Sequence, residues 1–136
     1  MAFDPAEFLA TAKSVLADGR CEGDFRTVAG RAYYAAYGTM RAQLSRAKGI
    51  PPDRLFGRAG RHSDVVNAIS FSSPALKKIG VQYRRLYATR VQSDYKYDTE
   101  MGRSEAEMAL QAASWIVSTL HNLPDRDFKA APLVPR

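Results

Sequence analysis

Residues 76–97 carry a run of side chains, spaced three or four positions apart, that starts apolar and ends polar: Leu76, Ile79, Tyr83, Leu86, Arg90, Asp94 and Tyr97. On a helix of about 3.6 residues per turn, these spacings place all seven on one face. Because an unpaired charge is costly to bury, Arg90 must pair with an acid, reach a wet cleft or meet an anionic ligand. Asp94, one turn later, could simply neutralise Arg90 beside the core, and that structural interpretation stays open.

Capping residues mark further helix starts along the chain. We expect N-caps at Asp4, Asp24, Ser63, Ser73 and Ser104, the last in a capping box with Glu107. Phe3 is expected to pack on Phe8 beside the first cap. The predicted helices end near Asp18, Gly49, Phe71, Tyr97 and His121.

The second and the last of these helices have apolar faces with helical periodicity. In the second, the inward residues are Phe25, Val28, Ala29, Ala32, Tyr33, Ala36, Tyr37, Met40 and Leu44. In the last, they are Ala106, Ala109, Leu110, Ala113, Ile116, Val117 and Leu120. Since no alternating strand pattern competes, the sequence predicts an all-α, antiparallel bundle of four to five helices.

A chain of 136 residues has the length of one domain. We expect the bundle to occupy residues 4–123 and residues 124–136 to form a flexible tail. The final Leu133-Val134-Pro135-Arg136 resembles the remnant of a thrombin cleavage site, so the tail is expected to include an expression scar.

Cysteine content and hydropathy narrow the class of protein. Cys21 is the only cysteine, which excludes an intrachain disulfide and a cysteine-based metal site and favours the reducing cytoplasm. The longest uncharged run, residues 108–124, is interrupted by polar side chains, and no signal peptide is apparent. We therefore expect a cytoplasmic protein with no membrane contact.

The net charge of +6 is concentrated in two segments. Residues 41–62 hold six basic side chains against one acid, and residues 77–90 hold five against none. This pattern favours a phosphate-rich partner such as RNA, although a solvated basic face gives the same pattern.

Three segments resemble a known family. They are Arg-Ala-Tyr-Tyr-Ala-Ala-Tyr at residues 31–37, His-Ser-Asp-Val at 62–65 and Arg-Val-Gln-Ser-Asp-Tyr at 90–95. In order and spacing they resemble HEPN domains, the nucleotide-binding domains of higher eukaryotes and prokaryotes, and the resemblance covers residues 5–121.

The resemblance implies a helical bundle that forms a homodimer, often encoded beside a minimal nucleotidyltransferase in prokaryotic toxin–antitoxin or phage-defence modules. Active members of the family are metal-independent endoribonucleases that use a cleft at the dimer interface. In them, an arginine on the fourth helix holds the scissile phosphate, and a histidine one to two turns later acts on the ribose hydroxyl or the leaving oxygen. Arg90 matches that arginine.

No histidine follows Arg90, because residues 91–97 read Val-Gln-Ser-Asp-Tyr-Lys-Tyr. Asp94 could orient Arg90 or act as a base, and Tyr95 or Tyr97 could donate a proton. The candidate catalytic residues are therefore Arg90, Asp94 and Tyr97. The resemblance further implies that Tyr97, or Tyr95 beside it, receives adenylyl groups from the nucleotidyltransferase.

Candidate residues for binding RNA or phosphate are Arg31, Arg61, His62 and Arg85. Arg61 and His62 follow a glycine-containing basic loop that could hold phosphate at a helix N-terminus, or could be a plain linker. We expect no metal and no cofactor. Three functions remain open: an endoribonuclease, a non-catalytic dimer that binds a nucleotidyltransferase or a nucleotide, or a purely structural helical adaptor. Tyr87, Val91 and Tyr95 form the edge on which self-association is expected.

Overall fold

The computed structural model describes residues 3–51 and 73–129. Within these ranges, the helices are α1 (Glu7–Asp18), α2 (Glu22–Lys48), α5 (Pro74–Tyr95), α6 (Arg103–Asn122) and α7 (Asp125–Lys129). The described residues contain no strand, which confirms the prediction of an all-helical fold. The helix expected over residues 63–71 lies outside the described residues, as do Arg61 and His62.

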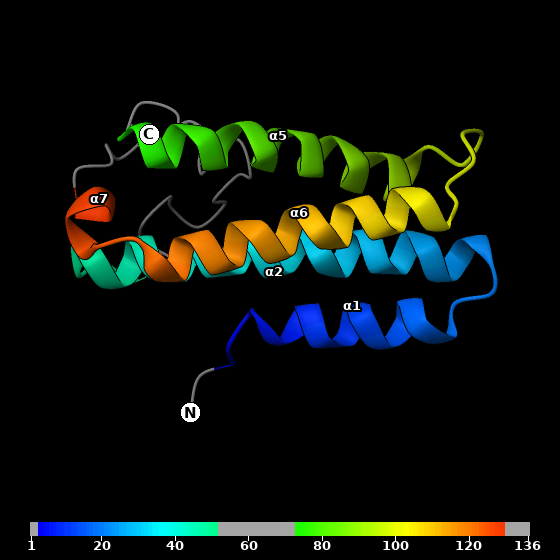
Figure 1. Cartoon of the computed structure of the whole chain (residues 1–136), viewed down its shortest axis with the longest axis horizontal. Helices are drawn as coiled ribbons and strands as arrows, with labels where there is room; N and C mark the ends of the chain where they lie inside the picture. The colour runs from blue at the N-terminus through cyan, green and yellow to red at the C-terminus, as the bar shows by residue number, and fades with distance from the viewer. Residues whose placement is uncertain (1–2, 52–72, 130–136) are drawn as a thin grey trace.

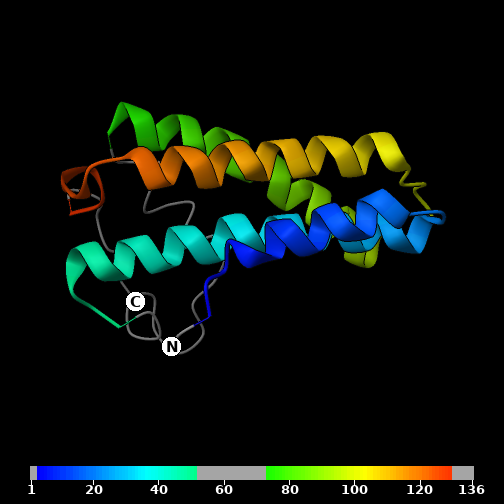
Figure 2. The ribbon, with the colours of Figure 1, turned by 60° about the horizontal axis from the view of Figure 1, so that its bottom comes forward.

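The four long helices run antiparallel to their neighbours in sequence. Figure 1 shows α2 and α6 side by side in the middle, with α1 and α5 on either side of them. Figure 2, turned by 60°, shows α1 beside α2 and α5 beside α6. The candidate site lies where α5 meets α2, so this packing decides the surroundings of Arg90.

Helix α1 begins later than the sequence predicts, because residues 5–6 form a turn and its N-cap is Ala6, not Asp4. Asp4 accepts a hydrogen bond from the backbone N–H of Ala6 at 3.0 Å, and the regular helix begins at Glu7. The rings of Phe3 and Phe8 lie 5.0 Å apart, which confirms the predicted contact across the helix start. Ser73 caps α5 by accepting from the N–H of Leu76.

Two further predicted caps are wrong. Helix α2 begins at Glu22, so Asp24 lies within its first turn and accepts from the backbone N–H of Arg20 at 3.0 Å. Helix α6 has Gly102 as its N-cap, and the carboxylate of Glu105 accepts from the Gly102 N–H at 3.0 Å. Because α6 begins at Arg103, Ser104 lies inside its first turn and is not the cap.

The C-terminus of α5 is held by Arg26 of α2, which the sequence pattern did not reveal. Its guanidinium donates hydrogen bonds to four backbone carbonyls, those of Gln92, Ser93, Lys96 and Thr99. Its Nε also pairs with Glu22 at 2.7 Å. Carbonyls at a helix end lack partners within the helix, so Arg26 fixes where α5 stops.

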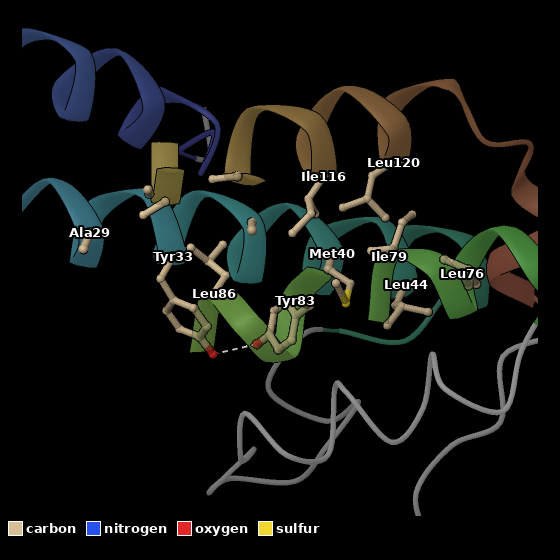
Figure 3. Packing of buried hydrophobic residues seen from close by; sticks show 14 of the residues in the cluster. Ala29, Tyr33, Met40, Leu44, Leu76, Ile79, Tyr83, Leu86, Ile116 and Leu120 are labelled. Atoms are coloured by element: carbon tan, nitrogen blue, oxygen red, sulfur yellow. Dashed lines mark hydrogen bonds between the residues drawn. The ribbon is translucent and has the colours of Figure 1, made fainter. Parts of the chain in front are cut away.

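The core confirms the predicted apolar faces with few exceptions. All seven apolar residues expected on the last helix are buried in α6. On α2, Phe25 and Tyr37 are half-buried and the other predicted residues are buried. Figure 3 shows this core, including a hydrogen bond of 2.6 Å between the hydroxyls of Tyr33 and Tyr83. Burial raises the pKa of both hydroxyls well above the ordinary value.

A close approach near the start of α1 requires a glycine. A Cβ on Gly38 would lie 2.8 Å from Cγ of Pro5 and closer still to its Cβ. By contrast, a Cβ on Gly30 would meet Asp94 Oδ1 at 3.9 Å, an ordinary van der Waals contact.

The segment after residue 123 does not behave as a tail throughout. Residues 125–129 form α7, which packs against α2, and Phe128 is fully buried in the core. The expectation of a flexible tail from residue 124 is therefore wrong for this segment, because an aromatic ring covers the end of the core. Residues 130–136, including the expected scar, lie outside the described residues.

None of the helices within residues 3–51 and 73–129 combines the length and apolar content needed to cross a bilayer.

Candidate functional site

Arg90 lies at the contact of α5 with α2, at the point where the buried face of α5 becomes polar. Its side chain is only 13% exposed, whereas that of Asp94 is 38% exposed. The buried residues Leu76, Ile79, Tyr83 and Leu86 precede it on the same face of α5. The guanidinium is thus held inward at the edge of the core.

Asp94 and Tyr34 are the polar partners of Arg90. Arg90 Nε lies 3.0 Å from Asp94 Oδ2, and Arg90 Nη2 donates a hydrogen bond of 3.1 Å to the Tyr34 hydroxyl. The Nε contact is an ion pair whose angles do not satisfy a hydrogen bond, so the buried Nε–H has no hydrogen-bond acceptor among the described residues. The structural interpretation of the pair is therefore confirmed, but the pairing leaves donor capacity unused.

Aromatic rings surround the same guanidinium. Its carbon lies 5.8 Å, 5.7 Å and 5.5 Å from the ring centroids of Tyr33, Tyr34 and Tyr95. Contacts of a cation with ring faces at this distance are attractive. Tyr33 is buried, whereas Tyr95 is 65% exposed, so the rings form a wall that opens towards solvent.

Arg90 stays protonated in this environment. Burial acts to lower the pKa of Arg90, but Tyr34 and Asp94 outweigh it and raise the pKa above its ordinary value. The guanidinium therefore remains a cation, able to attract an anion but unable to exchange a proton.

Tyr97, the third predicted catalytic residue, is separated from this pair. Because α5 ends at Tyr95, Tyr97 lies beyond the helix and not on its inward face, contrary to the predicted stripe. Its side chain is 76% exposed, and its ring lies 5.6 Å from the Arg26 guanidinium. Both candidates for modification, Tyr95 and Tyr97, are thus accessible to solvent.

The two predicted phosphate-binding residues that the structure describes, Arg31 and Arg85, lie in different places. The Arg31 guanidinium lies 5.4 Å from the ring of Tyr34, which also contacts Arg90, so these two cations share one aromatic ring. Arg85 is exposed and faces α6 instead, where it lines a separate groove. Arg31 is therefore near the Arg90 site, and Arg85 is not part of it.

Sequence reasoning missed the roles of Tyr34 and Arg26. Tyr34 lies three positions after Arg31 on one helix face, a spacing that hints at their contact but not at the bond to Arg90. The spacing of Glu22 and Arg26 predicts their ion pair, yet only the tertiary structure shows the carbonyls that Arg26 reaches.

Among residues 3–51 and 73–129, no three histidine, cysteine, aspartate or glutamate side chains are grouped so that they could hold a metal ion. Comparison of the chain with protein-family models, with curated proteins and with solved structures finds no match.

Proposed function

We propose that this chain is a HEPN-type RNA-binding protein that acts as a homodimer and holds a phosphate of RNA at Arg90. The observation that supports this proposal is the position of the Arg90 guanidinium, charged and held inward beside a partly exposed Asp94 and an open aromatic wall. The motifs of residues 31–37 and 90–95 add the resemblance to the family. The family setting is a toxin–antitoxin or defence module with a minimal nucleotidyltransferase partner.

Asp94 limits how strongly the site can attract an anion. Its carboxylate pairs with Arg90, and the negative end of the α5 dipole lies in the same turn. A phosphate must therefore compete with Asp94 for the guanidinium. Removing the charge of Asp94 is expected to strengthen RNA binding, whereas removing Arg90 weakens it.

If the protein cleaves RNA, Asp94 has a second role. In a metal-independent ribonuclease, Asp94 would take the proton of the ribose 2′-hydroxyl as its oxygen attacks the phosphorus, and Arg90 would stabilise the negative charge on the phosphate while the 5′-oxygen leaves with a proton from solvent. Arg90 and Asp94 are close enough to act on one phosphodiester, since their charged atoms lie 3.0 Å apart.

The non-catalytic alternative is favoured by a specific observation. Asp94 is tied to Arg90, and the one histidine among the described residues, His121, lies in the last turn of α6 and not on α2 or α5 beside the pair. In this alternative, the dimer binds RNA, a nucleotide or the nucleotidyltransferase without cleaving RNA.

One set of variants separates binding from cleavage. Binding of labelled single-stranded RNA and its cleavage in EDTA are measured for the wild type, Arg90→Ala, Asp94→Asn and, as a charge-matched control, Arg126→Ala on the exposed surface of α7. We expect Arg90→Ala to weaken binding about tenfold and to flatten its salt dependence, and Asp94→Asn to tighten it. Loss of cleavage in Asp94→Asn identifies the ribonuclease, while binding without cleavage in the wild type identifies the alternative.

The site and the dimer are tested separately. RNA affinity that is the same for Arg90→Ala and Arg126→Ala would refute the assignment of the phosphate to Arg90. Dimerisation is expected across the edge formed by Tyr87, Val91 and Tyr95, of which Tyr87 and Tyr95 are exposed. Light scattering that finds only monomers, at concentrations where RNA binds, would refute the shared cleft.

A further inference from the structure

A groove of about 170 Å³ lies between α5 and α6, which run side by side in Figure 1. Helix α5 lines it with Gln82, Arg85, Leu86 and Thr89, and α6 lines it with Met108, Ala109 and Ala112. The floor is apolar, because Leu86 and Ala109 are almost fully buried. Small alanine side chains on α6 explain why the space between the helices stays unfilled.

The groove and the Arg90 site lie on different sides of α5. Tyr83 and Arg90 face α2, where they contact Tyr33. Arg85 and Thr89 face α6. An inference about the groove therefore stands independently of RNA binding at Arg90.

The volume of the groove favours protein side chains over a small molecule as its occupant. Pockets that enclose cofactors or drug-sized ligands measure roughly 300–1,000 Å³, well above this groove. One or two apolar side chains of a docked helix match the smaller space. Helices with apolar side chains in successive turns bind hydrophobic grooves in this manner.

The two rims of the groove differ in charge. On the α5 rim, Lys78 lies one turn before Gln82, so two exposed cations, Lys78 and Arg85, follow the groove, and the only acid of α5 is the distant Asp94. On the α6 rim, the exposed apolar residues Met108 and Trp115 lie two turns apart, on the same face as Ala112.

Glu105 is the acidic residue on the groove-facing row of α6, one turn before Met108. Its carboxylate already accepts the N–H of Gly102. An occupant of the groove therefore meets positive charge along the α5 rim, from Lys78 and Arg85, while Glu105 is already engaged on α6.

We propose that this groove is a docking site for an amphipathic helix of a partner protein. One row of that helix is apolar and contacts Met108, Trp115 and the groove floor, and one edge is acidic and pairs with Lys78 and Arg85. The span from Lys78 to Thr89 corresponds to about 16 Å of helix, or three turns. The occupant thus carries apolar side chains over three turns and glutamate or aspartate along one side.

A pair of synthetic peptides tests this proposal on the full chain. Both form three to four helical turns, share one leucine row and lack tryptophan. One has glutamates along its edge, and the other has lysines at the same positions. Trp115 is the only tryptophan in the chain and lies beside the groove, so its fluorescence reports binding without a label. We expect the glutamate peptide to bind with a Kd near 10–100 μM and to shift Trp115 emission to shorter wavelength.

Variants then locate the contact. Arg85→Glu is expected to weaken binding of the glutamate peptide at least tenfold and to strengthen binding of the lysine peptide. Arg84→Glu, which removes the same charge from the opposite edge of α5, is the matched control and is expected to leave both affinities unchanged. Ala112→Leu fills the groove and is expected to abolish binding, with thermal unfolding as the check that the variant folds.

Four results would overturn the proposal, and three of them concern the peptides. They are the absence of binding of the glutamate peptide at about 1 mM, equal affinities for the two peptides, and equal effects of Arg84→Glu and Arg85→Glu. A concentration-dependent Trp115 shift without peptide, removed by Ala112→Leu, would show that a second copy of this chain covers the groove, and would likewise overturn the proposal. These outcomes leave the Arg90 assignment untouched, since none of the variants alters that site.

Discussion

Phe128 gives the sharpest test of how the bundle is closed. It lies in a five-residue helix near the end of the described chain, yet its side chain is fully buried against the core. Replacing it with alanine removes roughly 150 Å² of buried aromatic surface, which at about 25 cal/mol per Å² amounts to about 4 kcal/mol. Measured costs of truncating a buried phenylalanine agree, at about 3–5 kcal/mol. Since domains of this size are stable by only about 5–15 kcal/mol, the loss is large.

Urea denaturation followed by far-UV circular dichroism measures the effect. With a slope of about 2 kcal/mol per M, we expect Phe128→Ala to lower the midpoint by about 2 M. The matched control is Phe3→Ala, which removes the same ring from a site that is 58% exposed and is expected to cost at most about 1 kcal/mol. Equal, small losses in both variants would refute the conclusion that α7 belongs to the core.

The helix glycines and the buried tyrosines provide two further tests. Gly38→Ala is expected to destabilise the fold by about 1–3 kcal/mol, because the methyl group overlaps the proline ring at the start of α1. Gly30→Ala, its control on the same helix, is expected to be neutral or to stabilise by up to about 1 kcal/mol. A thermal melt that ranks the two in the opposite order contradicts this reasoning. The raised pKa of Tyr33 and Tyr83 means that the unfolded chain ionises first above pH about 10, so it binds fewer protons than the folded chain there and stability falls with rising pH. Replacing both with phenylalanine is expected to flatten that decline in urea titrations between neutral and alkaline pH, and an unchanged slope would exclude the tyrosines as its cause.

The described helices were largely predictable from local patterns. The apolar face of α6 was recovered residue for residue, because each position repeats at the helical period. Helix α2 is buried more widely than its predicted stripe, since Ala35, Thr39 and Gln43 are also covered. Both α1 and α6 pack on this helix, and no single-face pattern expresses that arrangement.

Helix ends were less predictable than helix faces. The expected caps at Asp24 and Ser104 failed because Glu22 and Gly102 offered earlier starting points. The end of α5 is fixed by Arg26, which comes from a helix about 70 positions away in the sequence. Local spacing carries no information about such a partner.

Because helical periodicity is a local property, the residue pattern alone indicates that α5 carries an arginine and an acid one turn apart at the end of an apolar face. The packing of the helices is needed to show that Tyr34 binds the arginine, that Tyr97 lies outside the helix and that Arg85 faces a groove. Similarly, composition suggested a tail where packing places Phe128 in the core. These outcomes depend on which helices pack together. That packing is determined by burial and electrostatic pairing between segments that are distant in the sequence, so it is a property of the whole chain.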